Sequence, residues 1–96
     1  MSKRSPRRNS VEAKDAKWRR SVKEIDGGFC KLHFFVTSIT CWGNIECHHI
    51  EGKQARPDLR YDISNGICLC QNHHDWVGRY PKAGRDAIDM AIRLRI

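Results

Sequence analysis

Two pairs of potential metal ligands share the same spacing in this 96-residue sequence. Cys30 and His33 are separated by two residues, and Cys70 and His73 repeat that spacing about 40 residues later. A two-residue spacer lets one tight turn aim both ligand atoms at a single tetrahedral ion, and zinc takes Cys and His in such sites. We therefore predict a structural Zn²⁺ held by Cys30, His33, Cys70 and His73, with Cys41 as the alternative for one position.

A second group of residues has the types needed for catalysis. His48 and His49 are adjacent in the β-prone segment 45–50, and adjacent residues of a strand point to opposite faces of a sheet. One imidazole can then bind a metal ion while the other acts on a nearby water. Asn65 opens the next strand and His74 lies on the following helix, so we expect the chain to return compactly and place His48, Asn65 and His74 around one cavity.

The cysteine count also favours metal over disulfides. All five Cys and all five His lie between residues 30 and 74. An odd number of Cys, in a chain whose basic N-terminus is not followed by an apolar signal segment, argues against a disulfide framework. A body of roughly 70 residues has a marginal core, which a structural metal would stabilise. Cys47 and Cys68 lie in apolar segments and are expected to pack in that core.

The net charge of +7 is concentrated at one end of the sequence. Residues 1–23 contain nine of the eighteen Lys and Arg and two of the eleven acidic residues, so the remainder is neutral. A basic arm on a neutral body indicates contact with a nucleic acid. The expected contacts to DNA are Arg19, Arg20, Lys53, Arg56 and Arg60. No apolar run is long enough for a membrane span, so we expect a soluble, cytoplasmic protein without membrane contact.

The hydrophobic pattern predicts the elements that hold these residues. Residues 1–9 are expected to be disordered, and a helix should follow from about Val11 to Ile25, with Trp18, Val22 and Ile25 on its apolar face. Strands are expected at 34–37, 39–42, 45–50 and 67–70, with a loop over 51–61 and a hairpin-like turn at Asn65-Gly66. A short helix should cover 71–79, Pro81 and Gly84 should interrupt it, and a last helix should cover 86–95.

The segment 29–81 resembles an HNH endonuclease. The resemblance rests on ECHHI at 46–50, NGICLC at 65–70 and the His pair at 73–74, in the order and spacing of that family. It implies an α+β fold, a small ββα-metal (His-Me finger) domain with zinc knuckles and flanking helices. The nuclease domain would cover residues 10–96 and the disordered basic arm residues 1–9.

The resemblance also implies a role for each motif residue. His49 would be the general base that activates water, and Asn65 would orient it and pin the adjoining loop. His48 and His74 would hold a catalytic divalent metal, either Mg²⁺, Mn²⁺ or another transition metal. Some relatives carry a further His at the position of Gly78, which here offers no third ligand. The structural zinc ligands implied are the Cys30, His33, Cys70 and His73 set.

The expected function is therefore metal-dependent hydrolysis of DNA phosphodiesters, by nicking or double-strand cleavage. The run at 59–70 is most similar to small phage and prophage HNH proteins, which implies phage DNA processing in the host cytoplasm, beside a packaging terminase or another DNA-processing protein. The alternative is a non-catalytic, zinc-stabilised DNA-binding module, which needs the zinc ligands and the arm but neither His49 nor Asn65. A protein-binding adaptor with a merely solubilising arm is the third possibility.

Overall fold

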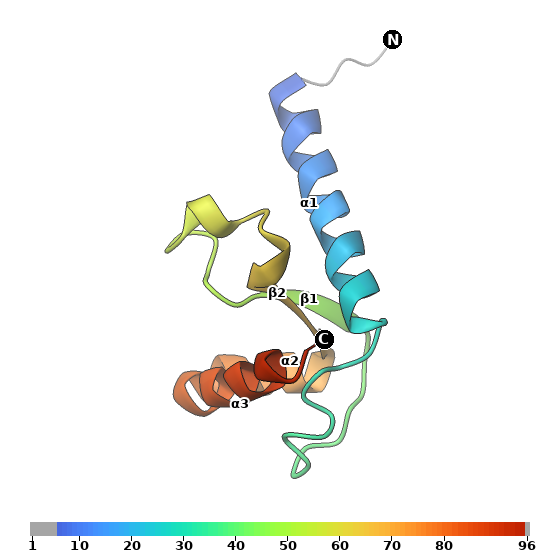
Figure 1. The fold of residues 1–96 in the computed structure, drawn as a ribbon, viewed down its shortest axis with the longest axis vertical. Helices are drawn as coiled ribbons and strands as arrows, with labels where there is room; N and C mark the ends of the chain where they lie inside the picture. The colour runs from blue at the N-terminus through green and yellow to red at the C-terminus, as the bar shows by residue number, and fades with distance from the viewer. Residues whose placement is uncertain (1–5, 96) are drawn as a thin grey trace.

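The computed structural model describes residues 6–95 and shows a small α+β fold (Figure 1). In these residues there are three helices and one two-stranded antiparallel sheet. In chain order the elements are α1 (Pro6–Asp26), β1 (Ile45–His49), β2 (Gly66–Cys70), α2 (Gln71–Arg79) and α3 (Pro81–Arg93). Two short 3-10 turns, Pro57–Leu59 and Ile63–Asn65, lie in the connection between the strands.

The β1–β2 sheet is the centre of the molecule. Its register pairs Ile45 with Cys70 and His49 with Gly66. All five residues of β2 are buried, which explains its continuous apolar pattern. Ile67 and Leu69 pack on one side with α2, α3 and the loop before β1, whereas Cys68 packs on the other side with α1.

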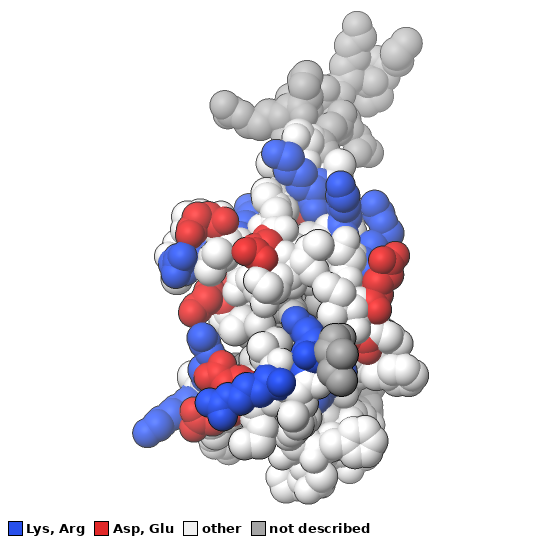
Figure 2. All heavy atoms as spheres, viewed as in Figure 1, with Lys and Arg blue, Asp and Glu red and all other residues white. Residues whose placement is uncertain are grey.

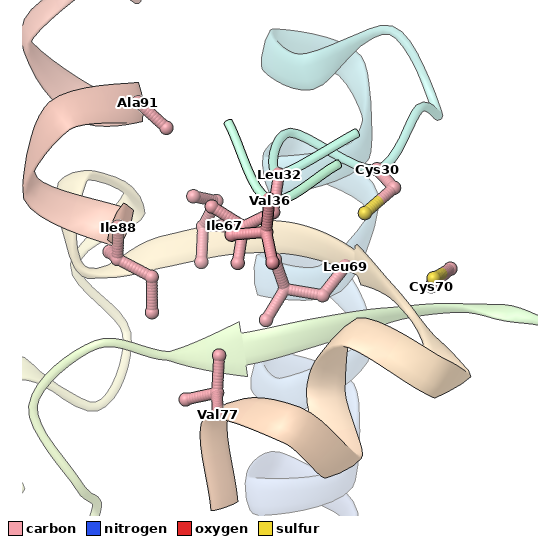
Figure 3. Packing of buried hydrophobic residues seen from close by; sticks show 9 residues of the cluster. All are labelled: Cys30, Leu32, Val36, Ile67, Leu69, Cys70, Val77, Ile88 and Ala91. Atoms are coloured by element: carbon pink, nitrogen blue, oxygen red, sulfur yellow. The ribbon is translucent and has the colours of Figure 1, made fainter. Parts of the chain in front are cut away.

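The larger core cluster joins four segments that are distant in sequence. Leu32 and Val36 come from the loop after α1, Val77 from α2, and Ile88 and Ala91 from α3 (Figure 3). These side chains meet on the Ile67 and Leu69 face of β2. The burial of these residues fixes the start of α2 against the sheet, and α2 carries His73 and His74.

Among the α1 side chains that the structure describes, those in the second half of the helix pack against the rest of the fold. Trp18 and Val22 form the smaller core cluster with Cys68, and Asp26 continues the same face, whereas Ile25, predicted to be apolar core, is 45 % exposed. The side chains from Ser10 to Lys14 are all exposed, and Figure 1 shows this end of α1 extending away from the sheet. The helix begins at Pro6, before the predicted start, so residues 6–9 of the expected arm are helical, and residues 1–5 lie outside the described part.

A buried ion pair connects the end of α1 to the last residues described. The fully buried Asp26 carboxylate accepts two hydrogen bonds from Arg95, at 3.0 and 2.8 Å, and one from the backbone N–H of Cys68 at 2.8 Å. Arg95 also donates to the carbonyl oxygen of Gly66 at 2.7 Å. Asp26 and Arg95 therefore hold α1, β2 and the C-terminal segment together.

The two strands predicted at 34–37 and 39–42 are wrong. The segment between α1 and β1 is a series of turns, in which the backbone N–H groups of Phe35 and Val36 both bond to the carbonyl of Leu32. Leu32 and Val36 point into the core while Phe34 is 83 % exposed. The backbone of this segment satisfies its hydrogen bonds within these turns, so it does not pair with β1 or β2 although, among the described residues, each of the two strands has an unpaired edge.

Two further boundaries differ from the prediction. α2 ends at Arg79, before Pro81, as predicted, but α3 begins at Pro81 and not at residue 86. The missing N–H of Pro81 costs nothing at a helix start, and the buried Gly84 lies inside α3 against the backbone of Val77. Asn65-Gly66 is not a tight hairpin turn, because Gly66 is extended and the strands are joined by the whole of residues 50–65. None of the described helices is long and apolar enough to cross a membrane.

Candidate functional site

Four potential metal ligands converge beside the larger core. The ligand atoms of Cys30, Cys41, Cys70 and His73 all lie within 4.8 Å of one another. Cys30 and Cys41 come from the loop between α1 and β1, and Cys70 and His73 from the junction of β2 with α2. Figure 3 shows the Cys30 and Cys70 side chains next to each other at this edge of the core. Three Cys and one His at this separation form a donor set that can hold a structural metal such as zinc.

The His73 imidazole is oriented for metal binding. Its Nε2–H donates to the carbonyl oxygen of Val36 at 2.9 Å, which leaves Nδ1 unprotonated and directed at the sulfur atoms. Nδ1 lies 3.0 Å from Sγ of Cys70 and 3.4 Å from Sγ of Cys41. A backbone carbonyl that takes the other ring N–H is the usual device by which proteins fix a ligating histidine.

The three thiols affect one another's ionisation. Burial raises the pKa of Cys30 and Cys41. The charge of Cys70 opposes ionisation of Cys30, and Cys30 and Cys70 both oppose ionisation of Cys41. Burial also acts against ionisation of Cys70, but hydrogen bonds from the backbone N–H groups of His73 and Trp42 and from the Cys41 thiol outweigh it and hold the pKa of Cys70 below its usual value. A bound cation would remove the repulsion between thiolates, so the composition of the cluster fits a metal.

The predicted ligand His33 lies outside this group of four, and Cys41 takes its place. Nδ1 of His33 is 3.4 Å from Sγ of Cys41, but the side chain is exposed and packs edge-on against Phe34. The Cys30–His33 spacing was a true signal of a turn, since the backbone N–H of His33 bonds to the carbonyl of Cys30. The turn directs only the first residue of the pair inward.

A second group of imidazoles lies between β1 and α2. Nδ1 of His48 is 3.2 Å from Nε2 of His74. Two nitrogen ligands on one tetrahedral ion, with bonds of about 2.0–2.1 Å, lie about 3.3 Å apart, so the two atoms are placed as a pair of ligands would be. Burial, with the nearby charges of His74 and His49, lowers the pKa of His48 to about 4. His48 is therefore neutral at pH 7 and has a lone pair to offer.

Glu46 is a functional candidate that the sequence reasoning missed. Its carboxylate accepts a hydrogen bond from Nδ1–H of His74 at 2.7 Å, which directs the lone pair of Nε2 toward His48. The signal for Glu46 was its position two residues before His48, because alternate residues of a strand lie on one face. The spacing alone did not indicate a partner for Glu46, because that partner, His74, lies on α2 and meets β1 only in the folded structure.

His49 points to the other side of β1, as predicted for adjacent strand residues. Its ring stacks on the indole of Trp18, with centroids 3.8 Å apart and planes 4° apart. Its Nε2–H donates to the carbonyl oxygen of Arg60 at 2.9 Å, so Nδ1 is left as the proton acceptor. Burial lowers the pKa of His49, which favours the neutral imidazole.

Asn65 lies apart from the imidazole pair and holds the loop instead. Its Oδ1 accepts the backbone N–H of Glu51 at 2.7 Å, and its Nδ2 donates to the carbonyls of Glu51 and Leu59 at 3.0 and 3.2 Å. These hydrogen bonds join Asn65 to the loop and not to His48 or His74, so the three side chains are not grouped around one cavity as predicted. The role of pinning the loop agrees with the hydrogen bonds, and the loop in turn presents the Arg60 carbonyl to His49.

The predicted DNA-contacting residues divide into two kinds. Arg60 forms a bidentate pair with Asp15 of α1, at 3.1 and 2.8 Å, and Arg56 pairs with Asp58. These charges are already partnered within the chain. Arg19, Arg20 and Lys53 are exposed and have no ion pair among the described residues. Figure 2 shows Lys and Arg side chains along the described part of α1.

Comparison of this chain with protein-family models, curated proteins and solved structures finds no match. The structure shows a small α+β fold and a Cys/His cluster able to hold a metal.

Proposed function

We propose that this chain is a metal-dependent endonuclease that hydrolyses DNA phosphodiesters on a ββα-metal scaffold of the HNH type. The observation that carries the proposal is the separation of 3.2 Å between Nδ1 of His48 and Nε2 of His74. These atoms come from the first strand and the helix of a β1–β2–α2 unit, and His49 follows His48 directly.

The imidazoles would divide the chemistry between them. A divalent cation held by His48 and His74 would neutralise the negative charge that develops on the phosphate during bond cleavage. His49 would take a proton from the attacking water at Nδ1, because its Nε2–H is committed to Arg60. Its lowered pKa keeps it neutral, and therefore basic, at pH 7. Water would attack in line and leave 5′-phosphate and 3′-hydroxyl ends.

Four surrounding groups would position the reacting imidazoles. The Arg60 carbonyl and the Trp18 indole fix the ring of His49 from its edge and its face. Asn65 holds the ends of the loop that supplies that carbonyl. Glu46 fixes the tautomer of His74.

The Cys/His cluster would have a structural task in this proposal. Zn²⁺ bound by Cys30, Cys41, Cys70 and His73 would join the irregular loop before β1 to the start of α2. His74 follows His73 directly, so the same zinc would fix the position of a catalytic ligand. A core of this size would gain stability from such a link.

Cleavage of supercoiled plasmid tests the proposal. Purified zinc-loaded protein should nick or linearise the plasmid with Mg²⁺ or Mn²⁺ and should be inactive with EDTA. His49→Ala should lower the rate by about two to four orders of magnitude, the usual contribution of a general base. His33→Ala is the matched control, because His33 is exposed and lies outside both the His48–His74 pair and the Cys/His cluster, and it should retain the rate.

DNA binding without cleavage in any divalent metal would contradict the proposal. It would favour the non-catalytic, zinc-stabilised DNA-binding module, which uses the Cys/His cluster and the basic helix alone. A rate that His49→Ala leaves unchanged would also exclude His49 as the base, whatever the metal dependence.

A further inference from the structure

A groove between α1 and the loop before β2 lies next to the proposed general base. It has a volume of about 440 Å³ and is lined by Lys14, Lys17, Trp18, Ser21, Tyr61 and Ile63. The four α1 residues share one face of the helix, because their spacing is three to four residues. Lys14, Lys17 and Tyr61 were not among the residues that the sequence singled out for DNA contact.

The groove carries positive charge that the chain does not neutralise. Lys14 and Lys17 are exposed and have no carboxylate partner among the described residues. Nζ of Lys14 lies 5.7 Å from the centre of the Tyr61 ring. Asp15, an acidic neighbour on this part of α1, is bound by Arg60 in a bidentate pair. The cations of the groove are therefore available to an anion from outside.

The remaining lining groups suit a sugar–phosphate chain. Ser21 offers a hydroxyl donor, and Tyr61 and Ile63 offer apolar surface that is 37 and 40 % exposed. Lysines for the phosphates, with an aromatic ring and an aliphatic side chain for the sugars, are the contacts that fix a nucleic acid backbone without reading its sequence.

The Trp18 side chain borders both the groove and the proposed base, His49. The Trp18 indole lines the groove and stacks on His49 at 3.8 Å, and Tyr61 follows the residue whose carbonyl binds His49. A strand lying in the groove would thus continue directly to the reacting imidazole. The end of α1 that projects beyond the sheet would extend the same contact (Figure 1).

We propose that the Lys14–Lys17–Ser21–Tyr61 groove binds the phosphodiester backbone of DNA beside the His49 site and so positions the strand to be cut. This inference rests on the proposed nuclease function for its purpose, but DNA binding in the groove can be measured without cleavage. It assigns to α1, which lies outside the β1–β2–α2 unit, the task of holding the substrate.

Fluorescence anisotropy with a labelled DNA duplex tests the groove, using the full, zinc-loaded chain in a His49→Ala background so that the DNA stays intact. Each phosphate contact to duplex DNA contributes about 0.9 to the slope of log Kd against log salt. Lys14→Ala/Lys17→Ala should lower that slope by about 1.8 and weaken binding at low salt by tenfold or more. The control Lys82→Ala/Arg93→Ala removes the same charge from α3, on the other side of the sheet, and should change the slope little.

Two outcomes would overturn the inference. One is an equal loss in the α3 variant, which would show that only net charge matters. The other is an unchanged slope in the groove variant. In addition, a preference for an RNA duplex of the same sequence would overturn the assignment to DNA.

A second pair of variants provides an independent check of the groove. Ser21→Glu should weaken DNA binding because it places a negative charge in the groove, whereas Ser38→Glu, at an exposed residue outside the groove, should not.

A small diester separates this inference from the nuclease proposal. Bis(p-nitrophenyl) phosphate is too short to occupy the groove and the His49 site together. With His49 present, the groove variant should hydrolyse it at the unaltered rate, whereas His49→Ala should not. Groove-dependent DNA binding without hydrolysis of either substrate would sustain the groove and exclude the nuclease.

Discussion

Glu46 and His74 form a carboxylate–imidazole pair, with Oε1 of Glu46 2.7 Å from Nδ1 of His74. The two residues lie on facing elements, β1 and α2, and each is partly exposed. The carboxylate accepts a hydrogen bond from Nδ1–H, so the Nε2 atom that faces His48 carries the lone pair. The pair therefore fixes both the direction and the tautomer of a proposed ligand.

Removal of that carboxylate should weaken the proposed catalytic metal site. We expect Glu46→Ala to raise the dissociation constant of Mn²⁺ by about 10- to 100-fold, the usual effect of losing the partner of a ligating histidine. Glu46→Gln should lose less, because its amide oxygen still accepts the Nδ1–H. Titration calorimetry of zinc-loaded protein measures both, and identical Mn²⁺ affinity in all three proteins would exclude the positioning role.

Gly78 offers a gain-of-function test of the same site. It lies four residues after His74 on α2, on the same face, and a Cβ added there meets no atom within 4 Å. Gly78→His should supply a third imidazole and strengthen Mn²⁺ or Ni²⁺ binding by about tenfold or more. Arg79→His places the same side chain on another face of α2 and should have no effect. Equal gains in the two variants would mean that the metal does not bind near His74.

The ligands of the structural metal can be distinguished by a pair of substitutions. Cys41→Ser should lower the zinc content of purified protein and its thermal stability, because binding energy of a structural zinc is folding energy. His33→Ala should retain one zinc per chain and the same Tm, since His33 lies outside the group of four. Elemental analysis and thermal unfolding measure both properties. The reverse pattern would restore the ligand set predicted from spacing.

The Asp26–Arg95 pair should contribute strongly to stability. Asp26→Asn leaves the Arg95 guanidinium, 13 % exposed, without its carboxylate, and loss of one partner of a buried pair costs about 3–5 kcal/mol. Arg56→Ala, which breaks the exposed pair with Asp58, should leave the free energy of unfolding nearly unchanged. Urea denaturation of the zinc-loaded protein compares the two. Equal effects would mean that Asp26 does not bind Arg95 in solution.

Gly66 should tolerate no side chain because α1 crosses β2 at this point. A Cβ there would lie 2.7 Å from Cζ2 of Trp18 and closer still to Val22, both of which are buried. Gly66→Ala should therefore destabilise the fold by about 1–3 kcal/mol, as overpacking does. Gly52→Ala, which meets no neighbour, is the control. Chemical denaturation that finds the two variants alike would show that α1 does not pack at Gly66.

Strands and helices that depend on the local residue pattern could be predicted from the sequence alone. The strands near 45–50 and 67–70 and the helix at 71–79 were predicted, and the structure confirms them with small shifts. The pairing of Cys70 with His73 also followed from spacing, because both lie on one continuous strand-to-helix junction. Within such a unit, the backbone geometry fixes where each side chain points.

Contacts between residues of separate segments could be identified only from the folded structure. Cys41 instead of His33 completes the Cys/His cluster, because the irregular loop before β1 is shaped by burial of Leu32 and Val36 rather than by a repeating pattern. The same holds for Glu46 and Arg60. Glu46 meets His74 because α2 packs against β1, and Arg60 meets Asp15 because α1 packs against the loop. Sequence spacing encodes direction along one element, whereas contacts between elements depend on packing of the whole core.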